Sequence, residues 1–156
     1  MDTRPEHYFE ASRERLETAR RLYEEGRDYV AATYFAGLAL ESMLRAFYPS
    51  EALFDARHDL GRIAQPGFNN VIGERSREPV GAAISEAMVR WRNDIRYYSA
   101  PLLNAFVRTI NRDHPTWRLS RGAEKNIAKE NCRRLLEAAA TVINVGVLKW
   151  KSFAND

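Results

Sequence analysis

One stretch of the chain, from about Tyr29 to Phe47, is apolar on nearly every side. At 3.6 residues per turn, its alanines, leucines and aromatic residues cover all faces of a helix rather than one stripe. Such a helix is stable only when other elements surround it, so the stretch predicts the buried centre of a helical bundle. Asp28 is suited to cap its start, and Pro49 is suited to end it.

The other segments also show helical spacing and are separated by proline and glycine. The expected helices run from Pro5 to a stop at Gly26, from His58 to Ile63, from Pro79 onward, from Leu102 to Ile110, and from Arg121 to Trp150 with Ser120 as its cap. The helix after Pro79 carries a stripe at spacings of 4, 4, 3, 4 and 3: Val80, Ile84, Met88, Trp91, Ile95 and Tyr98. The stretch 65–73 is left open between a loop and a short helical insertion, and 111–116 is expected to be a loop.

No stretch alternates apolar and polar residues as a strand does. The predicted fold class is therefore all-α, an antiparallel bundle of four main helices with one or two short extra helices. At 156 residues the chain fits one domain, spanning residues 1–156.

Composition excludes several classes of protein. Charged residues make up 29% of the chain, and no apolar run reaches the roughly 18 residues of a membrane span. The first residues lack the apolar region of a signal peptide, and Cys132 is the only cysteine, so a cytoplasmic location is expected. Zinc-site spacing and phosphate-loop, zincin and hydrolase motifs are absent, and we expect no cofactor or metal.

Arginine dominates the basic residues. The chain has 24 lysines and arginines, of which 20 are arginine, against 21 acidic residues. Residues 101–156 hold ten basic and five acidic side chains. Two interpretations stay open: arginine-rich codon usage, or a basic surface that faces phosphates.

The segment from Arg90 to Tyr98 gathers polar groups beside the apolar stripe. On a helix, Arg92 and Arg96 would stack on one exposed flank, as would Asn93 and Tyr97, because each pair is four residues apart. Asp94 follows Arg90 by four residues and would pair with it. The flank is either an ordinary solvated face with ion pairs or a binding surface.

Two segments of the sequence are similar to the motifs of a known family. The first comprises residues 25–32 and 39–46, with a glycine turn and a lone glutamate, followed by His58-Asp59-Leu60. The second is Arg92-Asn93-Asp94-Ile95-Arg96-Tyr97. Over roughly residues 6–150 the chain resembles a HEPN domain, the small helical domain of many prokaryotic toxin–antitoxin and defence systems.

The resemblance implies a site. Active HEPN domains are metal-independent ribonucleases, often dimeric, whose arginine and histidine line a cleft between protomers. Arg92 matches the arginine, but Tyr97 stands at the histidine position. An ordinary tyrosine titrates near pH 10, about three to four units above histidine, and is a poor general base. The resemblance therefore implies the fold, with absent or weak nuclease activity.

Other residues have competing interpretations. Glu41, the one acid in an apolar helix, is expected to be a buried carboxylate paired with an arginine, and His58 a helix-start residue rather than a ligand. His114 does not replace the missing histidine by spacing. Cys132 fits the core. The basic run from Arg118 to Arg134 is either a solvated face or a phosphate-binding ridge.

These observations predict a HEPN-like homodimer that binds RNA or a nucleotide through an arginine-rich groove. Its lining would be Arg92, Asn93, Arg96 and Tyr97, with Arg92 and, doubtfully, Tyr97 as catalytic candidates. The dimer is expected because the second and last helices offer more apolar surface than a four-helix monomer has to bury. The alternatives are an active endoribonuclease with an atypical base, and a structural module that binds a separate partner protein. No membrane partner is expected.

Overall fold

The computed structural model describes residues 4–48 and 57–154, and every regular element in these ranges is a helix. The α-helices are α1 (Pro5–Glu25), α2 (Tyr29–Ala46), α3 (Leu60–Ala64), α4 (Phe68–Val71), α5 (Glu74–Arg90), α6 (Ala100–Asp113) and α7 (Ile127–Phe153). Three 3₁₀ helices lie between them: η2 (Asn93–Tyr97), η3 (Pro115–Trp117) and η4 (Arg121–Asn126). The predicted all-α class is confirmed.

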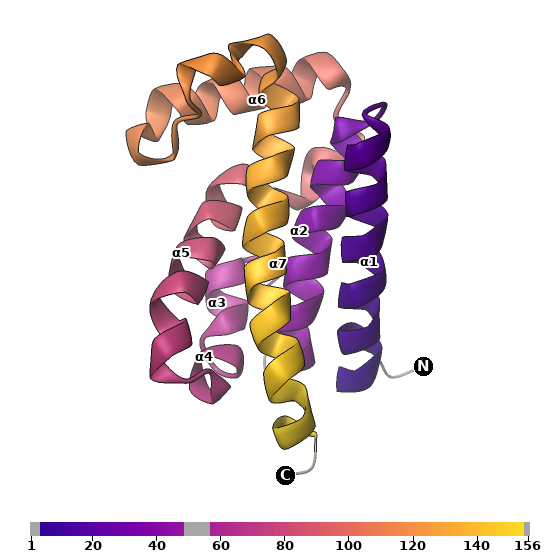
Figure 1. Cartoon of the computed structure of the whole chain (residues 1–156), viewed down its shortest axis with the longest axis vertical. Coiled ribbons are helices and arrows are strands. Elements are labelled where there is room, and N and C mark those ends of the chain that lie inside the picture. The colour runs from indigo at the N-terminus through magenta and orange to yellow at the C-terminus, as the bar shows by residue number, and fades with distance from the viewer. Residues whose placement is uncertain (1–3, 49–56, 155–156) are drawn as a thin grey trace.

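Four helices run along the long axis of the molecule, and one lies across its end. Figure 1 shows the chain passing up α1, down α2, up α5 and down α7, with α6 crossing the end where α5 finishes. The short helices α3 and α4 lie beside α5 toward the other end. None of the described helices is both long and apolar enough to span a membrane.

Helix α2 is the buried centre, as its composition predicts. Its inward residues, and several that would face solvent in an ordinary amphipathic helix, are inaccessible: Ala32, Ala36, Ala39, Leu40, Met43 and Leu44. Burying each of its larger side chains contributes roughly 1.5–3 kcal/mol. Gly26 ends α1 in the left-handed conformation at φ 69°, and the Asp28 side chain accepts a 2.9 Å hydrogen bond from the Ala31 amide. Pro49 lies outside the described residues.

The prediction for the helix around Pro79 is wrong at both ends. Helix α5 begins at Glu74, with Pro79 inside it, and stops at Arg90 instead of continuing to Tyr98. Trp91 leaves the helix at φ −126°, ψ 140°, because its indole packs against Gly37 of α2 and donates a 3.1 Å hydrogen bond to the Tyr34 carbonyl. Met88, also predicted to lie on the buried apolar stripe, is 49% exposed.

Two other boundaries differ from expectation. The last helix starts at Ile127, not Arg121, because the Asn126 side chain caps it by accepting from the Lys129 amide, while Ser120 makes no side-chain cap. Helix α6 continues to Asp113, into the segment expected to be a loop. Of the two alternatives for residues 65–73, a loop or a short helical insertion, the structure has the short helix α4.

The interior divides into two parts. The main core lies among α1, α2, α5 and α7 and includes Cys132, as predicted; burial raises the pKa of its thiol to about 12, so the thiol stays protonated and unreactive. A smaller α6 cluster joins two residues of α6 to three around the start of α7. Its members are Leu103, Val107, Leu119, Ile127 and Ala128.

Candidate nucleic-acid interface

The segment that follows α5 is held to the core by two side chains. Trp91 is 3% exposed and Ile95 is fully buried, and between them the chain turns from extended backbone at Arg92 into the 3₁₀ helix η2. Helix η2 packs against α2. Its polar residues are therefore presented on a short, anchored element rather than on a mobile loop.

Arg92 does not share a helical flank with Arg96, contrary to the prediction, because its backbone is extended at φ −140°, ψ 146°. Its guanidinium forms two parallel hydrogen bonds with Asp94, from Nε to Oδ1 at 3.2 Å and from Nη2 to Oδ2 at 3.0 Å. The predicted pairing of Asp94 with Arg90 is therefore wrong. Arg92 is exposed, but Asp94 neutralises much of its charge.

Arg96 and Tyr97 form the most prominent feature of the segment. The Tyr97 side chain is 75% exposed, and the Arg96 guanidinium carbon lies 4.7 Å from the centre of its ring. Interaction with the Tyr34 side chain raises the pKa of the exposed Arg96 guanidinium. We call this pair the Arg96/Tyr97 surface.

Asn93 and Tyr98 face the protein more than the solvent. Asn93 is half-buried, and its Oδ1 is buried without a hydrogen-bond partner among the described residues. Burial raises the pKa of the half-buried Tyr98, and the neighbouring Asp94 adds to the rise. Of the four predicted lining residues, the structure thus presents Arg96 and Tyr97 together, leaves Arg92 paired at the edge and turns the Asn93 oxygen inward.

Arg90 belongs to a buried network instead of the surface. Its side chain is inaccessible and donates to Glu86 Oε1 at 2.9 Å, to Asn131 Oδ1 at 3.1 Å and to the Trp117 carbonyl at 2.6 Å. Burial lowers the pKa of Arg90, and the hydrogen bond to Glu86 opposes that effect. Arg134 donates to the same Glu86 oxygen, so two cations share one carboxylate.

Glu41 is a buried carboxylate paired with an arginine, as predicted: Arg45 Nε lies 2.6 Å from Oε1. Its other oxygen lies 2.8 Å from His58 Nδ1. His58 stands just before α3, whose cap is Asp59, and its ring also packs against Trp91 at 6.2 Å between ring centres. Sequence reasoning missed this contact because Glu41 and His58 are 17 residues apart and lie on different elements.

The remaining candidates do not assemble into a site with these residues. His114 is exposed at the end of α6. The run from Arg118 to Arg134 is not one helical face, because Arg118 and Arg121 precede α7 while Arg133 and Arg134 form ion pairs on it. Among the described residues, no group of three or more His, Cys, Asp or Glu side chains is placed to hold a metal ion.

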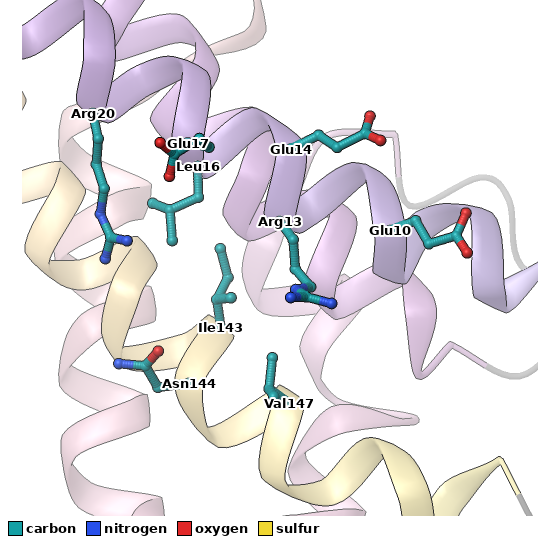
Figure 2. A pocket seen from close by; sticks show the side chains of 9 residues that line it. All are labelled: Glu10, Arg13, Glu14, Leu16, Glu17, Arg20, Ile143, Asn144 and Val147. Carbon is teal, nitrogen blue, oxygen red and sulfur yellow. The ribbon is translucent and has the colours of Figure 1, made fainter.

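A cavity of about 630 Å³ lies between α1 and α7. Figure 2 shows Leu16, Ile143 and Val147 between the two helices, with charged side chains of α1 around them. These charges are of both signs: Glu10, Arg13, Glu14, Glu17 and Arg20. Helix α2, by contrast, is largely covered within the chain, and its Phe35 and Leu38 are half-buried.

No family model, no curated protein and no solved structure matches the chain. The resemblance to HEPN domains therefore stays a prediction that rests on the residues quoted for it. Of those residues, the structure brings Glu41 and His58 into contact, and the His58 ring also packs against Trp91, the residue before Arg92.

Proposed function

We propose that the chain binds single-stranded RNA through the Arg96/Tyr97 surface, with Arg92 at its edge, and without efficient cleavage. The observation that supports this most directly is a tyrosine ring that is 75% exposed beside a guanidinium at 4.7 Å. An exposed aromatic ring adjoining a cation offers both partners that an unpaired nucleotide needs, a stacking face for the base and a charge for the phosphate.

The anchoring of η2 makes this surface suitable for binding. Ile95 and Trp91 are buried on either side of Arg92, so the backbone of η2 is held in place before a ligand arrives. Little backbone entropy is therefore lost when a ligand contacts the pair. The net charge of +3 adds a weak general attraction for polyanions.

A weak ribonuclease is the second candidate, favoured by the position of His58. Glu41 Oε2 binds its Nδ1 at 2.8 Å, the arrangement in which a carboxylate orients an imidazole, and the imidazole is 44% exposed. His58 also packs against Trp91, the residue before Arg92. The chain thus holds an oriented imidazole against the residue that precedes Arg92, although Tyr97 occupies the position of the family's histidine.

The double variant Arg96→Ala/Tyr97→Ala should bind RNA at least tenfold more weakly than wild type. Base–aromatic stacking contributes about 1–3 kcal/mol per base, and losing one phosphate contact should lower the slope of log K against log salt by about 0.7. Both side chains are exposed, so stability should change by no more than about 0.5 kcal/mol. Fluorescence anisotropy with a labelled ten-nucleotide RNA bearing a 5′-hydroxyl, together with thermal melting, measures all three quantities.

The matched control is Arg75→Ala, which removes an exposed arginine from the first turn of α5. An equal loss of affinity in this control would mean that only net charge matters and would contradict the proposal. Wild type that fails to bind at low salt would favour the interaction module instead. If wild type cleaves RNA in the presence of EDTA and Arg92→Ala does not, the chain is a ribonuclease and not only an RNA-binding protein.

We further propose that two copies associate along the α1/α7 cavity. Val147 is 39% exposed in it and the adjoining Leu148 is 79% exposed. Because this strip of α1 carries both acids and arginines, it can pair with the same strip of a second copy in a two-fold arrangement. The occupant that fits both the apolar floor and the mixed charges is a second copy of the chain.

Light scattering at micromolar concentration should give the mass of two chains for wild type and of one chain for Val147→Asp/Leu148→Asp. The reason is that two buried carboxylates would face the partner's apolar residues. Met88→Asp, which changes an exposed apolar residue on α5, should leave the mass unchanged. A monomeric wild type would contradict the homodimer.

A further inference from the structure

A second cavity, of about 450 Å³, lies between the last turns of α6 and the segment that joins η3 to η4. Four arginines line it: Arg108, Arg112, Arg118 and Arg121. Two of them come from α6 and two from the segment before α7, so the fold creates a cluster that the primary sequence spreads over 14 residues. We call this cavity the arginine pocket.

The charges in the arginine pocket are poorly balanced. No carboxylate is part of the lining formed by described side chains. Arg112 forms two hydrogen bonds with the neighbouring Asp113, at 2.6 and 3.0 Å, and this pair holds the pKa of Asp113 below its usual range. Arg108 and Arg121 make no hydrogen bond or ion pair with any described residue. Two guanidiniums are therefore free to bind an anion.

The shape of the pocket is set by Asn111. Its side-chain oxygen accepts a 2.9 Å hydrogen bond from the Leu119 amide, and its carbonyl accepts one of 2.9 Å from Arg118 Nε. These bonds tie the segment before η4 back to α6. Leu119 and Ile127, both nearly buried, complete the wall. The lining thus gathers four guanidiniums, of which only Arg112 has an acidic partner among the described residues, and this favours an anion as the missing partner.

We propose that the arginine pocket binds a phosphate monoester. Planar guanidiniums donate paired hydrogen bonds to phosphate oxygens, and a dianion balances two free arginines better than the single charge of a phosphodiester. The volume falls within the range of small-molecule sites, so a mononucleotide or a terminal nucleotide of RNA fits. The shared chemistry is the terminal phosphate, which comes either from a free nucleotide or from an RNA end.

This pocket is separate from the Arg96/Tyr97 surface. The surface lies just before the start of α6, and the pocket lies at its end, so about 18 Å of helix from Ala100 to Arg112 divides them. The proposal therefore does not depend on RNA binding at η2. RNA binding at the Arg96/Tyr97 surface and phosphate binding in the arginine pocket can each be disproved without the other.

The test compares adenosine 5′-monophosphate with adenosine by calorimetry at low salt, on wild type and on Arg108→Ala/Arg121→Ala. Wild type should bind the monophosphate and not the nucleoside, and inorganic phosphate should displace the monophosphate. The pocket variant should lose at least tenfold in affinity. The control Arg62→Ala/Arg75→Ala removes two exposed arginines from α3 and α5 and should bind like wild type.

The two sources of phosphate are separated by a labelled RNA with a 5′-phosphate or a 5′-hydroxyl. If wild type binds the 5′-phosphorylated RNA more tightly than the 5′-hydroxyl RNA, and the pocket variant does not, the ligand is an RNA end. If wild type binds both RNAs equally but still binds the monophosphate, the ligand is a free nucleotide. Arg96→Ala/Tyr97→Ala should retain the monophosphate, and the pocket variant should retain the 5′-hydroxyl RNA. Equal binding of adenosine, equal binding by the pocket variant, or no monophosphate binding at all would overturn the proposal.

Discussion

Arg90→Met should destabilise the protein by about 3–5 kcal/mol, the usual loss when one partner of a buried ionic network is removed. Arg90 is inaccessible, and its hydrogen bonds to Asn131 and to the Trp117 carbonyl have no substitute donor in the variant. Methionine fills much of the volume, so the loss reports unsatisfied polar groups instead of an empty cavity. Urea denaturation followed by circular dichroism measures the free energy of unfolding.

The matched control is Arg134→Met, which removes the other cation on Glu86. Arg134 is 36% exposed and, among the described residues, its side chain hydrogen-bonds only to Glu86, so its loss should cost less than about 1 kcal/mol. Because Arg90 stays in place, Glu86 keeps a partner in this control. Equal stabilities for the two variants would show that the Arg90 network contributes little to folding.

Gly37→Ala should cost about 3 kcal/mol, at the upper end of ordinary overpacking. A Cβ at this position would lie 2.0 Å from Trp91 Cδ1 and 2.1 Å from Cγ, and both atoms belong to a rigid ring. The indole cannot retreat without losing its hydrogen bond to the Tyr34 carbonyl. Thermal melting and urea denaturation measure the effect.

Gly81→Ala should have the opposite effect on stability from Gly37→Ala, in a helix of similar length to α2. Gly81 lies inside α5 with nothing within 4 Å of the added Cβ, so the better helix propensity of alanine should stabilise the protein by about 0.5–1 kcal/mol. A stable Gly37→Ala variant would mean that Trp91 can leave its position on α2. In that case η2 would no longer have the anchor on which the Arg96/Tyr97 surface depends.

The parts of the fold that follow from local chemistry could be predicted from the sequence. The burial of α2 follows from its composition, and the turn between α1 and α2 follows from Gly26 and the Asp28 cap. The end of α5 could not be predicted, because Trp91 and Ile95 continue the helical spacing while the backbone between them is extended and then 3₁₀. The spacing of apolar residues indicates which residues are buried in the core, but not the backbone conformation that connects them.

The candidate sites show the same division. Burial of Glu41 and its pairing with an arginine could be inferred from its place in an apolar helix, and Arg45 lies one turn away. The contact with His58 and the arginine pocket both depend on which separate segments meet, and spacing carries no such information. One signal was present for the pocket: between Arg108 and Arg121, Asp113 is the only acidic residue.

The small cluster beneath α6 has a consequence for how the molecule opens. Because Leu103 and Val107 lie in a cluster that meets the main core only through half-buried residues such as Tyr29 and Phe106, we expect α6 to detach as a unit while α1, α2, α5 and α7 stay packed. Backbone amides of α6 would then exchange with solvent through this partial opening, at a lower free energy than global unfolding. A ligand that binds only the docked form at one end of α6 would slow that exchange along the whole helix and strengthen binding at the other end, a coupling that needs no change in the folded structure.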